Sequence, residues 1–100
     1  MKRIKLRKIK LDGNELEWAE ILRQVVQRPL DPQRGVDIDE MRKSIRLLDI
    51  IDASNGVLEL EDSDWEYLKS KTVAMQWAVI DRNIVKLVDE VVLATEEPAL

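Results

Sequence analysis

Three carboxylates form the first group in the sequence whose spacing could support chemistry. Asp62, Asp64 and Glu66 lie in the run ELEDSDWE, which contains five acidic residues and no basic one. Paired carboxyl groups can act as general acid and base on glycosides or phosphates, and a D-x-D spacing can bind a divalent cation. Each of the three also stands where a helix N-terminus favours negative charge. We interpret them as helix-stabilising charges, and a metal-dependent enzyme is our third hypothesis.

Other residues with catalytic chemistry are few. The chain has no cysteine and no histidine, which removes disulfides, thiol chemistry and the commonest general base near neutral pH. The serines therefore have no histidine to activate them. The three glycines stand singly at 13, 35 and 56, so no phosphate-binding loop is recognisable. We expect a protein that is not an enzyme and that uses no cofactor or metal.

The N-terminus is strongly basic. Residues 1–10 hold six of the 16 Lys and Arg residues and no acidic residue, whereas the remaining ninety residues carry a net charge of −10. Such a segment can bind the phosphates of a nucleic acid. The candidate residues for this role are Lys2, Arg3, Lys5, Arg7, Lys8 and Lys10. The residues between them are aliphatic, not the aromatic residues that stack on bases, which favours a strand with one face in the core. Docking of a protein partner on this strand is a further possibility.

Tryptophan is over-represented among the aromatic residues. Trp18, Trp65 and Trp77 make up three of the four aromatic residues, and phenylalanine is absent. Such side chains pack in the core or, when exposed, often dominate the binding energy of protein interfaces. All three are therefore candidates for contacting a partner. Trp77 is the first candidate because it ends a predicted helix and lies off the apolar stripe of that helix.

The first 18 residues predict a β-hairpin. Apolar residues alternate in each half of residues 3–11, with a one-residue shift at Arg7–Lys8 that a β-bulge would correct. Asp12-Gly13 is a strong turn signal, and a short return strand is expected at 15–18.

A third strand is expected at 57–61, where VLELE alternates apolar and acidic residues. If this strand pairs with the first, Lys5 or Lys10 stands across from Glu59 or Glu61. Cross-strand pairs of opposite charge would then hold part of the basic charge inside the fold.

Apolar residues repeated at spacings of three and four predict four helices. Their ranges are 19–28, 38–53, 64–77 and 82–93. Asp37 and Ser63 each stand three residues before a glutamate, which is the capping-box spacing, and Asp81 is a suitable N-cap for the last helix.

The helix at 38–53 carries the most extended apolar stripe. The stripe consists of Ile38, Met41, Ile45, Leu48 and Ile51. Leu47 and Ile50 broaden it, so we expect this helix to be central. Asn55-Gly56 supplies the left-handed residue that commonly follows a helix.

The element order predicts an α+β fold with a small antiparallel sheet packed with about four helices. One hundred residues with 45% hydrophobic content suit a single domain, expected at 1–93, with a flexible tail at 94–100. The longest apolar runs have four residues, far fewer than the roughly 20 of a spanning helix. No apolar stretch of a signal peptide follows the basic start, so we expect a cytoplasmic protein.

The segments EMRKSIRLLDIID, VLELEDSDWEYLKSK and IVKLVDEV resemble a pattern found in small uncharacterised proteins encoded by tailed bacteriophages and prophages. The resemblance covers roughly residues 36–92. It implies a protein in the cytoplasm of an infected bacterium, or in the virion, and a role in virion assembly or in binding a host protein.

Our first hypothesis is therefore a non-enzymatic protein-interaction module that binds a virion component, a host protein or itself. The alternative is a nucleic-acid-binding accessory protein that uses the basic N-terminal strand. Neither hypothesis involves a membrane or a small-molecule substrate.

Overall fold

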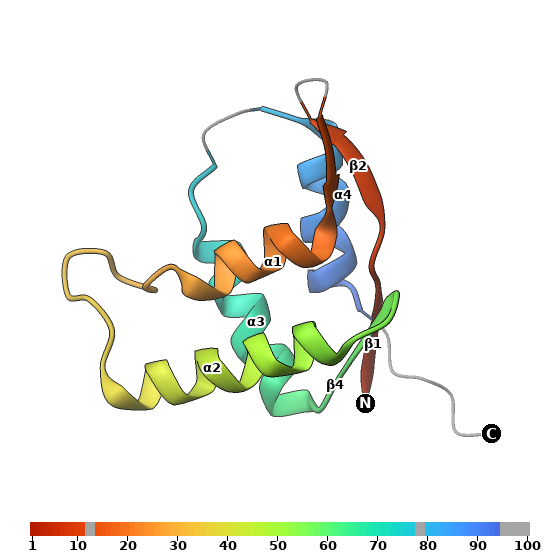
Figure 1. Ribbon diagram of the computed structural model, residues 1–100. Helices are drawn as coiled ribbons and strands as arrows, with labels where there is room; N and C mark the ends of the chain where they lie inside the picture. The colour runs from red at the N-terminus through yellow and green to blue at the C-terminus, as the bar shows by residue number, and fades with distance from the viewer. Residues whose placement is uncertain (12–13, 78–79, 95–100) are drawn as a thin grey trace.

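A computed structural model shows an α+β fold, as the element order predicts, with four helices and four short strands among the residues it describes (Figure 1). It describes residues 1–11, 14–77 and 80–94, and for residues 9–11 and 14 only the main chain. The strands are β1 (Lys2–Lys5), β2 (Lys8–Leu11), β3 (Asn14–Glu17) and β4 (Val57–Leu60), and the helices are α1 (Trp18–Gln27), α2 (Ile38–Ala53), α3 (Asp62–Ala74) and α4 (Arg82–Val92). The turn predicted at Asp12-Gly13 and residues 95–100 of the predicted tail lie outside the described residues.

The long strand predicted at 3–11 is divided between two partners. β1 pairs antiparallel with β4, and β2 pairs antiparallel with β3, so the strands form two two-stranded ladders. The Leu6 N–H donates to Gly56 O at 2.9 Å, and the Trp18 N–H donates to Arg7 O at 2.8 Å. The bulge predicted near this point is therefore a change of partner strand between Leu6 and Arg7.

The predicted pairing between the first strand and VLELE is confirmed, but its register differs from the expected one. Arg3, and not Lys5, stands opposite Glu59, and Lys5 stands opposite Val57. Lys10 lies opposite Glu15, within the hairpin ladder. The difference arises because β1 is only four residues long and its register is set by placing Ile4 in the core.

Helices α1 and α4 bury the apolar stripes that the sequence shows. The buried residues are Trp18, Ile21, Leu22, Val25 and Val26 on α1, and Ile84, Leu87 and Val91 on α4. α1 ends at Gln27 because Arg28 precedes a proline and is extended, with φ −83° and ψ 137°. The predicted cap of α4 is confirmed, since the Asp81 carboxylate accepts from Asn83 N at 2.7 Å.

Helix α2 has the predicted bounds, and the Asp37 side chain caps it by accepting from Glu40 N at 2.7 Å. The Glu40 carboxylate is directed elsewhere: it accepts from Leu30 N at 3.2 Å and from Lys71 Nζ at 2.8 Å. Gly56, beyond the helix, has φ +79°, which confirms the left-handed residue expected there.

Helix α3 begins two residues before its predicted start. Its N-cap residue is Glu61, whose side chain makes no capping hydrogen bond, so the prediction of Ser63 as the cap is wrong. Asp62 and Asp64 place negative charge in the first turn, which stabilises the free N–H groups without a cap. The helix ends at Ala74 instead of 77 because Met75 is extended.

The core lies where the ladder of β1 and β4 meets the four helices. Its largest fully buried side chains include Trp18, Ile4, Leu22, Leu47, Leu58, Leu60, Leu68 and Leu87. α1 and α2 lie side by side, α3 contacts both, and α4 packs against β1 and β2. α2 lies along one edge of the molecule (Figure 1), which leaves one of its sides without a neighbouring element.

Candidate functional site

The three carboxylates of the ELEDSDWE run do not converge. The Asp64 carboxylate accepts from Arg46 Nε at 3.0 and 3.1 Å, and Glu66 lies 3.8 Å from Lys69 Nζ. Within residues 1–11, 14–77 and 80–94, no three His, Cys, Asp or Glu side chains lie close enough together to hold a metal ion. The arrangement supports the interpretation of Asp62 and Asp64 as first-turn charges of α3, whereas Glu66 lies beyond that turn.

Most of the basic N-terminal side chains contact residues of the same chain. Their ion pairs are Arg3 with Glu59 at 3.5 Å, Arg7 with Glu90 at 3.2 Å, and Lys8 with Glu15 and Glu17 at 3.8 Å each. Lys2 Nζ lies 4.7 Å from the centre of the Trp65 ring. Of the five basic side chains that the structure describes here, Lys5 alone has neither kind of contact. The side chain of Lys10 lies outside the described residues.

The three tryptophans take packing positions. Trp18 is 1% exposed and belongs to the core, which is one of the two roles that the sequence leaves open. Trp65 is half-buried, donates its Nε1–H to Val91 O at 2.7 Å, and has Lys2 and Lys69 over its ring. Trp77 is half-buried and packs against the core beyond the end of α3. None of the three is as exposed as the apolar residues on the outer side of α2.

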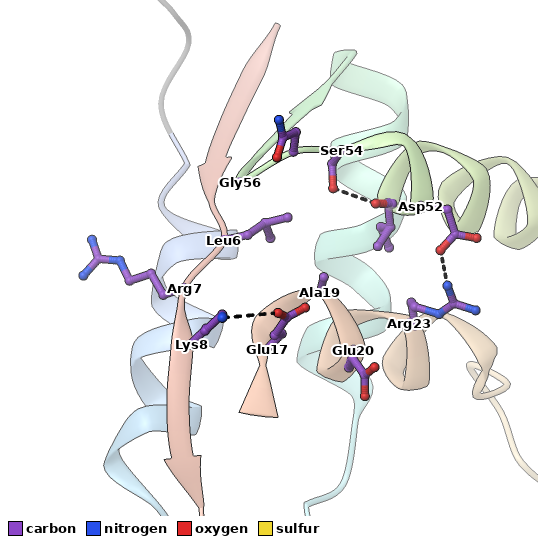
Figure 2. Close-up of a pocket in the computed structure, with 12 residues that line it drawn as sticks. Leu6, Arg7, Lys8, Glu17, Ala19, Glu20, Arg23, Asp52, Ser54 and Gly56 are labelled. Atoms are coloured by element: carbon purple, nitrogen blue, oxygen red, sulfur yellow. Dashed lines mark hydrogen bonds and ion pairs between the residues drawn. The ribbon is translucent and has the colours of Figure 1, made fainter. Parts of the chain in front are cut away.

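A hollow of about 400 Å³ lies between the start of α1 and the end of α2, beside the point where the N-terminal strand changes partner. Figure 2 shows ion pairs among the charged side chains that line it: Lys8 pairs with Glu17, and Arg23 pairs with Asp52. Arg7 points away from the hollow and pairs with Glu90. Because opposite charges neutralise each other around the hollow, it presents no field of one sign to a charged ligand.

Lys71 is a buried charged residue whose ammonium group is bonded within the fold. Its side chain is only 2% exposed, and its Nζ donates to Glu40 Oε2 at 2.8 Å and to Arg28 O at 2.5 Å. Tyr67 lies alongside, with its hydroxyl donating to Glu40 O at 3.1 Å. These contacts join α3 to the start of α2 and the end of α1, and a buried ion pair of this kind has a structural role.

The candidate site is the outer side of α2. Ile38, Met41 and Ile45 are 60, 44 and 51% exposed, although the sequence predicts that their stripe packs into the core. The buried side chains of α2 are Ser44, Leu47 and Ile51. The prediction of core packing is therefore confirmed for Leu47 and Ile51 but wrong for Ile38, Met41 and Ile45. We call these three exposed residues, together with the half-buried Leu48, the α2 face.

Helix geometry explains why the α2 face stays outside. Successive residues turn by about 100°, so Ile38, Met41 and Ile45 lie roughly a third of a turn away from Leu47 and Ile51. Only one of the two sides can pack on the core, and α1, β4 and α3 lie against the side of Leu47 and Ile51. The α2 face therefore remains exposed to water, on a helix that lies at one edge of the molecule (Figure 1).

The α2 face is surrounded by further exposed apolar residues and by charges that are paired within the chain. Leu30 and Val36, in the loop before α2, are also exposed apolar residues. Lys43 and Arg46 pair with acidic residues of the same chain, Asp39 and Asp64. An apolar stripe bordered by charges is typical of protein-interaction surfaces.

The sequence contains a signal that could have identified this surface. Apolar residues of α2 occupy two sides of the helix, with Ile38, Met41 and Ile45 on one and Leu47 and Ile51 on the other. A helix on the surface of a small domain buries only one such side. The width of the apolar arc, and not the stripe itself, therefore indicates that one apolar side of α2 is left uncovered by the core.

No family model matches the chain, and no curated protein or solved structure matches it either. No helix within the described parts of the chain combines the length and the apolar character needed to cross a membrane.

Proposed function

We propose that this chain is a protein-interaction module that binds another protein chain on its α2 face. One observation carries the proposal: Ile38, Met41 and Ile45 are largely exposed on a helix that already packs on the core through its other side. Their exposure contributes nothing to folding, whereas a bound protein would remove their apolar surface from water.

The spacing of the α2 face indicates the form of its partner. Ile38, Met41 and Ile45 stand at i, i+3 and i+7 along one line of the helix, which is the pattern of anchors in helix-to-helix docking. The proposal includes a non-enzymatic role. It also includes the phage setting that the resemblance implies, so the partner is a virion component, a host protein or a second copy of this chain.

Nucleic-acid binding receives less support. Arg3, Arg7 and Lys8 lie in ion pairs with glutamates of the same chain, and Lys2 stacks on Trp65. Binding a phosphate backbone through these residues would require it to compete with those carboxylates. The α2 face needs no such rearrangement.

The test is site-specific cross-linking in cells that contain the natural partners. A photo-crosslinking amino acid in place of Ile38 is expected to give a covalent adduct with a second protein chain. The same amino acid in place of Val73, which is 64% exposed on α3, is the matched control and is expected to give none. Mass spectrometry of the adduct identifies the partner.

A second variant separates binding from folding. Ile45→Gln is expected to abolish the adduct at position 38 while the far-ultraviolet circular dichroism spectrum and the unfolding midpoint stay the same. Adducts that form equally at positions 38 and 73, or that persist in the Ile45→Gln variant, would contradict the proposed docking surface.

A further inference from the structure

Two exposed charges beside the α2 face indicate which partner fits it. Arg42 and Asp49 are both exposed on α2, and within the described residues neither forms an ion pair or a side-chain hydrogen bond. Seven residues make nearly two full turns, so the two side chains lie on the same side of the helix, about 10 Å apart along its axis. Arg42 follows Met41 and Asp49 follows Leu48, so both border the apolar stripe.

We propose that the α2 face binds a second copy of this chain, with the two α2 helices antiparallel about a two-fold axis near Ile45. This inference rests on the proposed function and names its partner. In this arrangement Ile45 packs against Ile45 of the second copy, and Met41 packs against Leu48. A two-fold axis makes every such contact occur twice.

Charge complementarity supports the antiparallel direction. Because Arg42 and Asp49 lie on opposite sides of Ile45 in the sequence, antiparallel pairing places Arg42 of each copy beside Asp49 of the other. The two charges that lack a partner within the described chain then form two ion pairs across the interface. A parallel two-fold arrangement would instead place this flank of the two helices on opposite sides of the interface, so that Arg42 of one copy could not reach Asp49 of the other.

The size of the surface sets the expected strength of the dimer. α2 has 16 residues and is therefore about 24 Å long. The contact of two such helices is smaller than the roughly 1,600 Å² of a standard stable interface. We expect a reversible dimer with a dissociation constant on the order of micromolar.

The experiment is sedimentation equilibrium of the purified full chain over a range of concentrations. The wild type is expected to change from 11.6 kDa to twice that mass as the concentration rises. The single variants Arg42→Asp and Asp49→Arg each bring like charges together twice and are expected to raise the dissociation constant roughly tenfold or more. The double variant, which exchanges the two charges, is expected to return the dissociation constant to the wild-type value.

Arg82→Asp is the matched control, since it changes the net charge as Arg42→Asp does but lies on α4, and it is expected to leave the dimer intact. Circular dichroism establishes that each variant is folded. A chain that stays monomeric at every concentration overturns the inference. A double variant whose dissociation constant is as high as those of the single variants overturns it as well.

The two proposals can fail separately. If the purified chain is monomeric but position 38 still gives an adduct with a different protein, the α2 face is a docking surface and the second copy is not its partner. If the chain dimerises but Ile45→Gln has no effect on dimerisation, the dimer uses another surface, and the inference is overturned.

Discussion

Helices α1 and α2 lie side by side, both are amphipathic, and yet they use their apolar stripes in opposite ways. α1 has ten residues and buries its whole stripe, from Trp18 to Val26. α2 has 16 residues, packs through Leu47 and Ile51, and exposes Ile38, Met41 and Ile45. The same periodic signal therefore marks a core-facing side in one helix and a solvent-facing side in the other.

The difference shows what an apolar stripe can and cannot tell. Burial of apolar surface drives the packing of both helices, but a small domain has room for a limited amount of it. α1 is surrounded by the hairpin, α2 and α3, whereas α2 has neighbours on one side only. Four variants, taken from the largest expected effect to the smallest, test this contrast between the two helices.

Leu22→Ala is expected to cause the largest loss of stability. The Leu22 side chain on α1 is fully buried, and a cavity at such a position lowers the free energy of unfolding by roughly 3–5 kcal/mol. Gln24→Ala, on the exposed side of the same helix, is the control and should change the free energy by less than about 0.5 kcal/mol. Urea unfolding measures both, and equal losses would contradict the assignment of the buried side.

Glu40→Ala is expected to lower the free energy of unfolding by about 3 kcal/mol, because it leaves the buried charge of Lys71 without its anion. Asp39→Ala, which removes only an exposed pair with Lys43, should have little effect. The double variant Glu40→Ala with Lys71→Met removes both charges and should recover most of the loss. Absence of that recovery would show that Glu40 acts through other contacts.

Asp37→Ala compares the N-termini of the two helices. The Asp37 carboxylate caps α2 through its bond from Glu40 N, so its removal should cost about 1 kcal/mol. The corresponding residue of α1 is Glu17, which makes no capping hydrogen bond. Glu17→Ala should therefore lower the free energy of unfolding less than Asp37→Ala does, as measured by thermal unfolding. The opposite order would mean that packing contributes more than the cap.

Ile45→Gln is expected to have the smallest effect on folding. Because Ile45 is half exposed, its replacement should change the free energy of unfolding of the monomer by less than about 0.5 kcal/mol. The measurement is made at low protein concentration, where self-association does not contribute. Leu47 lies two residues along the same helix and is fully buried. Leu47→Gln should therefore lower the free energy of unfolding several times more than Ile45→Gln does. Similar losses for both would place Ile45 in the core.

Local sequence signals were sufficient for much of the fold. The stripes of α1 and α4, the caps Asp37 and Asp81, and the left-handed Gly56 all follow from residues close together in the chain. The start of α3 was mispredicted because two aspartates replace the cap that Ser63 was expected to provide. These features depend on main-chain hydrogen bonds and helix dipoles, which act over one or two turns.

The candidate site was not predictable in the same way. The sequence identified Ile38, Met41 and Ile45 as one stripe but assigned them to the core, and its candidates for contacting a partner were the tryptophans, if exposed. In the structure Trp18 lies inside and the α2 face lies outside. The width of the apolar arc shows that α2 has more apolar surface than one packed side can bury. Which part of the arc is buried depends on contacts between residues far apart in the chain, and periodicity does not show it.

The sequence alone determined the α+β class, the order of the elements and the apolar and charged sides of each helix, because these depend on short-range spacing and hydrogen bonding. Only the tertiary structure decided which partner each half of the N-terminal strand takes, which acidic residues face its basic ones, and which side of α2 meets water. Those outcomes depend on how the elements compete for one small core. The limited room in that core left Ile38, Met41 and Ile45 on the surface.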